Sequence, residues 1–411
     1  MPAASRIHAL LLAPLVVSAA RYCSLKPPNA VLSSSGPSSG GASGSAGTQP
    51  GLNSSSHGGT DPTDVVATAW YPGWNNFPPS EISWSKYNAM TFAFATTTPD
   101  SSTIALDDQS AALLPTFVAT AQANGVSALL SIGGWTGSMY YSSAVASAAN
   151  RTSFAAAVLG LVSTYQLDGI DFECVPLLSA PGDSANFLVF LQELRSTPAG
   201  QNLILTAAVG LKPFAGPDGN PMDDVSGFAK VLDRIAIMDY DVFGPGYSQT
   251  VGPNAPLNDT CAPPAQQITL GLASYGHSWP VTPSEALDGA HRLQPYASYS
   301  KSAPSGGSGN SGDSSFAALI DTGFLDSNGT AASASGISFV FDQCSQTPFV
   351  YNSTSQVMVS YDDAQLFIAA KGQFINSMGL AGFAVWDVTG DKNDLLLDSL
   401  HQSMGIESVC D

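Results

Sequence analysis

The chain has 411 residues, of which 44% are hydrophobic and 11% are charged. This length and composition predict one large folded domain with additional segments, and they argue against a mainly disordered chain. The formal net charge of −19 repels nucleic acid and anionic lipid, so we exclude both as partners, whereas a neutral polymer is compatible with such a surface.

The N-terminus has the pattern of a secretory signal peptide. Arg6 and His8 precede an apolar run from Ala9 to Val17 that is too short to span a bilayer, and the small residues Val17-Ser18-Ala19 follow it. We therefore predict a signal peptide over residues 1–19 and a secreted, extracellular protein without a membrane span.

Two further features fit secretion. Glycosylation sequons occur at Asn53, Asn150, Asn258, Asn328 and Asn352. In a secreted protein we expect disulfide bonds among the five cysteines, with the odd one left free, although the sequence does not give the pairing. These cysteines are Cys23, Cys174, Cys261, Cys344 and Cys410. No CxxC pair and no HExxH motif is present, so we expect neither a metal site nor a cofactor.

Residues 20–64 are dominated by Ser, Gly, Thr and Pro. A segment of this composition has too little apolar surface to bury on folding. It predicts a disordered linker, of the stalk-like kind that can carry O-linked sugars.

From residue 65 onward, short apolar segments alternate with helical patterns. The predicted strands are Val66–Trp70, Ala89–Ala95, Val126–Ile132, the segment after Asp168, Leu203–Val209, Arg234–Tyr240, Ile268–Tyr275 and Leu380–Trp386. The predicted helices run from Asp107 or Asp108 to Ala123, from Thr152 to Tyr165, over Ala185–Arg195 with Asp183 or Ser184 as cap, over Asp362–Met378 and over Asn393–Met404.

Eight short strands, mostly separated by helices, predict an α/β fold: a parallel (β/α)8 TIM barrel over residues 65–411. A doubly wound sheet is the alternative, but no glycine-rich phosphate loop opens any of the helices. A segment rich in Ser, Gly, Tyr and Phe, at about residues 280–360, breaks the rhythm. It predicts a small α+β insertion between strands seven and eight.

In such a barrel the carboxyl ends of the strands carry the chemistry. The aromatic and acidic residues at the predicted ends are Trp70, Tyr71, Trp74, Trp135, Asp171, Glu173, Tyr240, Asp241, Tyr275, Trp279, Trp386 and Asp387. Aromatic rings stack on sugar faces and carboxylates bond to sugar hydroxyls, so this set indicates a carbohydrate site. The alternative, that the rings only fill the barrel mouth, accounts for one or two of them.

The fourth strand carries two carboxylates on one face. Ile170 and Phe172 alternate with Asp171 and Glu173, and alternation with period two places both acids on the same side. Inward carboxylates are costly unless they are paired or used. The simpler alternative is that they cap the next helix or pair with basic groups.

With these residues placed, the chain from Ala67 to Gly405 resembles the glycoside hydrolase family 18 chitinases. The motifs that carry the resemblance are Ser131-Ile132-Gly133-Gly134 (SxGG), Asp168-Gly169-Ile170-Asp171 (the start of DGxDxDxE), Met238-Asp239-Tyr240-Asp241 (MxYD), Trp386, and Ser360-Tyr361-Asp362-Asp363.

The resemblance implies a monomeric enzyme that acts on chitin or chito-oligosaccharides by retaining, substrate-assisted hydrolysis, without a cofactor. It implies that a glutamic acid protonates the glycosidic oxygen while the acetamide of the substrate attacks the anomeric carbon. The implied catalytic residues are Asp171, Glu173, Tyr240 and Asp241. The implied substrate contacts are Trp70, Tyr71, Gly134, Trp135, Met238, Tyr275 and Trp386.

The sequence departs from the family pattern at the acid. In register, Glu173 stands at the sixth position of DGxDxDxE, where the family has aspartate, and Val175 stands at the eighth, where the acid belongs. A valine has no proton to donate. Glu173 shares the face but lies about 6.6 Å deeper along the strand, beyond the roughly 3 Å that proton transfer requires.

A second departure lies between strands six and seven. Residues Val242 to Gln267 are dominated by Gly, Pro, Asn and Ser and show no amphipathic helix, although a parallel crossover normally contains one. The chain therefore lacks material after strand four and before strand seven.

Three functions remain open. We take a chitinase-type hydrolase with Glu173 as surrogate acid as the primary expectation. The second is a catalytically silent chitin-binding protein on the same barrel. The third is a barrel that cleaves another glucan with Asp171 or Glu173 and a second carboxylate such as Asp241 or Asp387.

Overall fold

The computed structural model describes residues 23–26, 65–173, 182–211, 214–257, 268–300, 312–365 and 367–410. The predicted signal peptide, most of the predicted linker and Val175 lie outside the described residues, as do Asn53, Asn258, Cys174 and Cys261. No helix in the described part of the chain is both long and apolar enough to cross a membrane.

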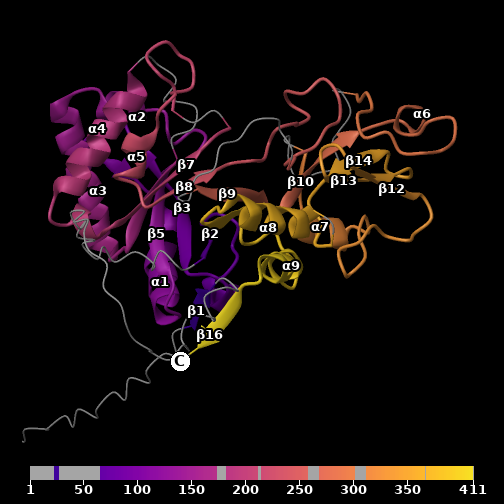
Figure 1. The fold of residues 1–411 in the computed structure, drawn as a ribbon, viewed down its shortest axis with the longest axis horizontal. Coiled ribbons are helices and arrows are strands. Elements are labelled where there is room, and N and C mark those ends of the chain that lie inside the picture. The colour runs from indigo at the N-terminus through magenta and orange to yellow at the C-terminus, as the bar shows by residue number, and fades with distance from the viewer. Residues whose placement is uncertain are drawn as a thin grey trace, which may run out of the picture.

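Eight parallel strands close into a barrel at the centre of the molecule (Figure 1). In order around the barrel they are β2 (Val66–Pro72), β3 (Ala89–Thr97), β5 (Ser127–Gly133), β6 (Gly169–Glu173), β7 (Ile204–Val209), β8 (Arg234–Ile237), β9 (Ile268–Ala273) and β15 (Gly382–Trp386). The pairing of β15 with β2 closes the ring. The predicted TIM barrel is confirmed.

Helices surround the barrel, and Figure 1 shows α2, α3 and α4 gathered on one side of it. The helices outside the insertion are α1 (Asp108–Ala123), α2 (Tyr141–Val145), α3 (Ala148–Tyr165), α4 (Asp183–Ser196), α5 (Ser226–Ala229), α8 (Phe367–Met378) and α9 (Leu395–Met404). Short 3-10 turns lie at Pro79–Glu81, Trp84–Lys86 and Gly200–Asn202, and the two-residue strand β4 (Ile104–Ala105) extends β3.

Helices α1 and α4 illustrate why these segments fold as they do. α1 buries Leu114, Phe117, Val118 and Ala121, which repeat at helical spacing, and α4 buries Phe187, Phe190, Leu191 and Leu194 with the same spacing. Full burial of a Leu or Phe side chain stabilises the fold by about 1.5–3 kcal/mol.

The helix caps differ partly from those expected. Asp107 caps α1, because its side chain accepts a hydrogen bond from the Ser110 backbone N–H at 3.0 Å. The predicted cap of α4 is wrong: the cap is Gly182, and Asp183 is already helical. The Asp183 carboxylate instead accepts a hydrogen bond from Ser142 Oγ on α2, at 2.8 Å.

An inserted sheet follows β9 almost without a break. Its five antiparallel strands are, in order across the sheet, β11 (Asp313–Ser315), β10 (Tyr275–Pro280), β14 (Val357–Ser360), β13 (Thr347–Asn352) and β12 (Ile337–Asp342). The short helices α6 (Pro283–Ala286) and α7 (Phe316–Asp321) complete the insertion, which Figure 1 shows beside the barrel. The sheet begins at Tyr275, five residues before the expected boundary.

The insertion has a hydrophobic core of its own. Trp279 is 0% exposed and packs with Val281, Phe349, Tyr351 and Met358. The expectation that Trp279 lies at the barrel rim is therefore wrong, because β10 turns away from the barrel into the inserted sheet.

Three predicted boundaries shift near the rim. β8 ends at Ile237 and β9 at Ala273, so Tyr240 and Tyr275 do not belong to barrel strands. The crossover helix α8 begins at Phe367 and not at Asp362, which precedes it and pairs with Lys371, with Oδ2 and Nζ 3.0 Å apart. The connection between β8 and β9 contains no helix in its described part, up to Leu257.

The two ends of the described chain form a small antiparallel pair. β1 (Cys23–Lys26) pairs with β16 (Glu407–Cys410), with Cys23 opposite Cys410. Leu25 is buried in the main hydrophobic core. The expectation of a disordered segment over residues 20–64 is therefore wrong for these four residues, because backbone pairing and the burial of Leu25 hold them in place.

Candidate functional site

A hollow of about 820 Å³ opens at the carboxyl ends of the barrel strands. Its lining comes from the ends of β3, β5, β6 and β15 and from the loops after β2, β7 and β8. This is the face on which parallel barrels place their active sites.

An aromatic wall, formed by Trp74, Phe94 and Trp386, lines one side of the hollow. The Phe94 and Trp386 rings are 5.6 Å apart and nearly parallel, at 18°, and the Trp74 ring lies 5.8 Å from Phe94. Trp135 stands at the edge of the hollow with 83% of its surface exposed. A row of flat, partly exposed rings is suited to the apolar face of a sugar.

Phe94 was missed by the sequence analysis. Regular alternation along β3 would point it to the same side as Phe92, which is buried against the surrounding helices. A register shift between Phe92 and Ala95 interrupts that alternation, and Phe94 lines the hollow instead. Such a shift leaves no signal in the alternation of residues.

Gly134 of the SxGG motif lines the hollow, as expected, and lies against the Phe94 ring of this wall. Its φ of +82° is unfavourable for residues with a side chain, and a Cβ added there would lie 2.9 Å from Cδ2 of the Phe94 ring. Only glycine lets the backbone approach the ring so closely.

The Asp171 carboxylate lies under the floor of the hollow and is 2% exposed. It accepts hydrogen bonds from Ser131 Oγ (2.7 Å), Trp70 Nε1 (3.1 Å) and Thr206 Oγ1 (2.5 Å). Burial raises the pKa of Asp171, and these three donors offset part of that effect. Asp171 is therefore a supporting group that a ligand in the hollow does not reach directly.

Two expected substrate contacts are wrong. Trp70 is 4% exposed, lies beneath Trp386 and holds Asp171 through its indole N–H. Tyr71 is 0% exposed, stacks on Phe117 and donates a hydrogen bond to the Phe77 carbonyl. The aromatic composition of a strand end does not tell which of its rings face the ligand.

Glu173 ends β6 and lines the hollow. Burial and the negative charge of Asp171 raise the pKa of Glu173 to about 8. No described group that donates a hydrogen bond contributes to this shift. At neutral pH the group is therefore mainly a protonated carboxylic acid, a form that can give up a proton.

Tyr240 and Asp241 face the hollow from the loop after β8, next to Met238. The Tyr240 side chain is 9% exposed, and its hydroxyl has no hydrogen-bond partner among the described residues. Asp241 accepts a hydrogen bond from Tyr275 at 2.5 Å. Tyr275 is thus placed behind Asp241 and does not line the hollow, in contrast to its expected role as a substrate contact.

Asp168, the first residue of the predicted signature, has a structural role. Its Oδ2 accepts hydrogen bonds from the Ala128 backbone N–H at 2.8 Å and from Gln122 Nε2 at 3.2 Å. These bonds tie the start of β6 to β5 and to α1, and Asp168 is not among the residues that line the hollow.

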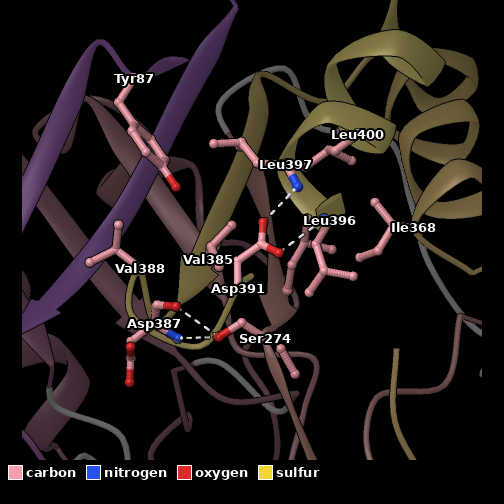
Figure 2. A pocket seen from close by; sticks show the side chains of 12 residues that line it. Tyr87, Ser274, Ile368, Val385, Asp387, Val388, Asp391, Leu396, Leu397 and Leu400 are labelled. Carbon is pink, nitrogen blue, oxygen red and sulfur yellow. Dashed lines mark hydrogen bonds between the residues drawn. The ribbon is translucent and has the colours of Figure 1, made fainter. Parts of the chain in front are cut away.

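Polar anchors behind the hollow fix the end of β15 (Figure 2). Ser274 Oγ donates to the Asp387 carbonyl at 2.7 Å and accepts from the Asp387 N–H at 3.0 Å. Figure 2 also shows Asp391, which accepts from the backbone N–H groups of Leu396 and Leu397 at the start of α9. Ser274, Asp387 and Asp391 line a separate cavity of about 20 Å³. Their hydrogen bonds hold the chain that follows Trp386.

The ionisable carboxyl groups that line the hollow are those of Asp107, Glu173 and Asp241, and no described lysine or arginine is among the lining residues. The site as a whole therefore combines aromatic rings, a neutral phenol and carboxyl groups. That combination suits an uncharged, hydroxyl-rich ligand.

Comparison with known proteins places this site in a family. The sequence profile of the glycosyl hydrolases family 18 matches residues 67–391. A chitinase-like effector of Moniliophthora roreri is 40% identical over 391 residues, which cover 84% of this chain and 94% of that protein. A class V chitinase of Arabidopsis thaliana is 28% identical over 367 residues, which cover 83% of this chain and 90% of that protein.

Solved structures agree in fold. The chitinase RmChi1 of Rhizomucor miehei matches with a TM-score of 0.69 and 26% identity, over 82% of this chain and 99% of that one. A class V chitinase of Nicotiana tobaccum matches with a TM-score of 0.71 at 22% identity, over 83% of this chain and 99% of that one. The chain therefore belongs to family 18 of the glycosyl hydrolases.

Proposed function

We propose that this chain binds N-acetylglucosamine oligomers in the hollow and hydrolyses them slowly or not at all. One contrast carries the proposal. The sugar-binding parts of the site are present among the described residues, whereas the acid position of the signature is Val175 in the sequence.

The chemistry of the walls supports an N-acetylated sugar. A pyranose ring can stack on Trp386, and an acetamide carries one N–H donor and one carbonyl acceptor. The free Tyr240 hydroxyl can donate to that carbonyl, and the Asp241 carboxylate can accept from the N–H. Neither contact requires a bond to break.

The names of two relatives support the same view. The proteins of Moniliophthora roreri and Moniliophthora perniciosa, 40% and 38% identical, are both called chitinase-like effectors. Relatives that match most of this chain are thus described as resembling chitinases.

A second candidate is slow hydrolysis with Glu173 as the acid. The observation that favours it is the raised pKa of about 8, which keeps this carboxyl group protonated at neutral pH. In that case Glu173 gives its proton to the glycosidic oxygen, the bond between that oxygen and the anomeric carbon breaks, and the leaving sugar departs as an alcohol. The acetamide oxygen of the substrate takes its place on the anomeric carbon as an oxazolinium, which water then opens while Glu173 takes back a proton. Tyr240 and Asp241 would hold that acetamide, with Asp171 as a supporting group beneath the floor of the hollow.

The decisive experiment compares binding and turnover of chitotetraose in four proteins. These are the natural chain, Glu173→Gln, the double variant Glu173→Asp with Val175→Glu, and Trp386→Ala. The double variant restores aspartate at the sixth position and glutamate at the eighth. We expect the natural chain to bind without measurable turnover, and Trp386→Ala to weaken binding about tenfold or more through lost stacking and buried area.

The outcomes separate the candidates. Turnover only in the double variant supports silent binding. Turnover in the natural chain that falls by about 10²–10⁴ in Glu173→Gln would establish Glu173 as the acid. Failure of the natural chain to bind chitotetraose, or cleavage of a β-glucan in its place, would overturn both candidates.

A further inference from the structure

Asp241 is held at its backbone as well as at its side chain. Its φ of +58° lies in the left-handed region, which costs free energy in a residue other than glycine. Its N–H donates to Asn254 Oδ1 at 2.9 Å, and its carbonyl accepts from the Tyr247 hydroxyl at 2.7 Å. This loop is therefore tied in the conformation that turns the carboxylate to the hollow.

The inserted sheet supplies the contacts to the carboxylate itself. Oδ1 of Asp241 accepts from the Tyr275 hydroxyl at 2.5 Å and lies 2.9 Å from His277 Nε2. Both partners are on β10, the first strand of the insertion. The hollow is thus walled in part by a carboxylate whose contacts come from outside the barrel.

His277 is itself held between two carboxylates. It is 5% exposed, and its second ring nitrogen, Nδ1, lies 2.8 Å from Asp313 Oδ1. Asp313 is the direct cross-strand partner of His277 in the pairing of β11 with β10. The three side chains form a row from the inserted sheet to the hollow, in the order Asp313, His277, Asp241.

We propose that His277 and Asp313 are positioning residues that hold the Asp241 carboxylate toward the ligand, so that the inserted sheet makes oligosaccharide binding dependent on pH. The proposal rests on the proposed function in that its main readout is chitotetraose binding. Neither His277 nor Asp313 lines the hollow, so both act through Asp241.

The charge state of His277 fits this role. Burial alone would lower the pKa of His277, but the contacts with Asp241 and Asp313 outweigh it and raise that pKa to about 9. Below about pH 9 the ring is an imidazolium whose positive charge lies between the two carboxylates, 2.9 Å from Asp241 and 2.8 Å from Asp313. Above that pH one nitrogen loses its proton and repels the carboxylate that it had held.

The other groups around His277 do not titrate over this range. Tyr275 packs edge-on against it at 5.7 Å, and the pKa of Tyr275 is raised well above its ordinary value. Tyr247 lies behind Asp241, and its pKa is raised as well. On the neighbouring strand β14 the residue paired with His277 is Ser360, which carries no charge.

The test measures chitotetraose affinity between pH 6 and pH 10 in the natural chain, His277→Gln and Asp313→Asn. Asp321→Asn is the matched control, because it removes the same charge from an exposed side chain on α7 that is paired with Lys392. We expect the affinity of the natural chain to fall as pH rises through about 9. In Asp313→Asn the midpoint should move down by about one pH unit, since one of two charges that raise the pKa is gone.

His277→Gln should bind about five- to tenfold more weakly at pH 7 and lose the step near pH 9, because a charge-assisted contact to Asp241 is replaced by a neutral one. Glu173 lines the same hollow and has a pKa of about 8, so any step that it causes is common to all of these proteins. Asp321→Asn should keep the natural midpoint. A shared midpoint in the natural chain and Asp313→Asn would overturn the proposal, as would unchanged affinity in His277→Gln.

A second measurement keeps this inference separate from the proposed function. The ring nitrogens of His277 can be titrated by NMR without ligand, in the natural chain and in Asp313→Asn. A raised pKa that falls in Asp313→Asn supports the row of three side chains even if chitotetraose does not bind, which would then count against the proposed function alone. An ordinary pKa, near 6.5 in both proteins, would overturn the inference whatever the binding result.

Discussion

Among single residues, Tyr240 has a hydroxyl whose effect on the stability of the fold can be measured separately from its effect on ligand binding. It is buried beside the hollow without a hydrogen-bond partner among the described residues. A buried polar group in that state costs about 1–3 kcal/mol of stability. Burial, together with nearby carboxylates, also raises its pKa well above the ordinary value, so the phenol remains a neutral donor.

We predict that Tyr240→Phe keeps or raises the melting temperature while it weakens chitotetraose binding about five- to tenfold. The free energy of unfolding rises because the substitution removes an unsatisfied hydroxyl from the interior. The affinity for chitotetraose falls because the ligand loses a hydrogen bond. Thermal unfolding and calorimetric titration on the same preparation measure the two effects.

Tyr71→Phe is the matched control for this variant. Its hydroxyl is also buried, but it donates to the Phe77 carbonyl and lies away from the hollow. The Tyr71→Phe variant should lose stability without losing affinity for chitotetraose. If Tyr240→Phe lost stability in the same way and kept its affinity, the hydroxyl would have a structural partner and no role in binding.

At this scale the sequence predicted the identity of site residues better than their orientation. Asp171, Glu173, Tyr240, Asp241 and Trp386 all lie in or directly beneath the hollow. Trp70 and Tyr71 were placed there wrongly, because neighbouring residues at a strand end point in opposite directions, and an inward ring can be covered by another ring. His277 was overlooked since its role depends on a cross-strand partner 36 residues away in the chain.

Between elements, the helix α8 is joined by a buried ion pair to the segment that precedes it. Lys371 on α8 and Asp362 before it have side chains that are 0% and 1% exposed, with Nζ and Oδ2 3.0 Å apart. Burial raises the pKa of Asp362 to about 7 against the opposing effect of Lys371, and Asp239, next to Tyr240, contributes to the rise. Lys371 therefore offsets the negative charge of Asp362, which also interacts with Asp239 in the loop after β8.

We predict that Lys371→Met destabilises the fold by about 3–5 kcal/mol at pH 8, where it leaves a buried carboxylate uncompensated. The loss should be smaller at pH 5, because Asp362 can then take up a proton and become neutral. The double variant with Asp362→Asn should recover part of the loss at pH 8. Urea unfolding at both pH values measures these differences, and a loss that is equal at the two pH values and additive in the double variant would contradict the coupling.

The elements themselves were largely predictable, because apolar strands and helical patterns alternate clearly from residue 65 onward. The start of the insertion was not predictable in the same way. The predicted strand Ile268–Tyr275 runs across the point where the chain leaves the barrel, after Ala273, and enters the inserted sheet at Tyr275. Tertiary pairing of Tyr275 to His277 with β11 decides that boundary.

For the whole molecule, the net negative charge determines which charged polymers are attracted and which are repelled. The net charge is −19, and the charged groups that line the hollow are acidic. A long-range field of this kind acts on charged ligands and is screened by salt over about 10 Å at 0.1 M ionic strength. An N-acetylated oligomer is neutral and does not respond to it, whereas the deacetylated oligomer is a cation and is attracted.

We therefore predict that chitotetraose affinity changes less than about twofold between 50 and 500 mM NaCl, whereas the affinity for the glucosamine tetramer falls clearly over the same range. Calorimetric titration of both ligands at pH 6 tests this, with an anionic polyuronate oligomer as the ligand that should not bind. The comparison also checks the choice of ligand. If the affinity for the glucosamine tetramer still exceeded that for chitotetraose at 500 mM NaCl, charge alone would not explain the preference. The acetamide contacts assigned to Tyr240 and Asp241 would then be wrong.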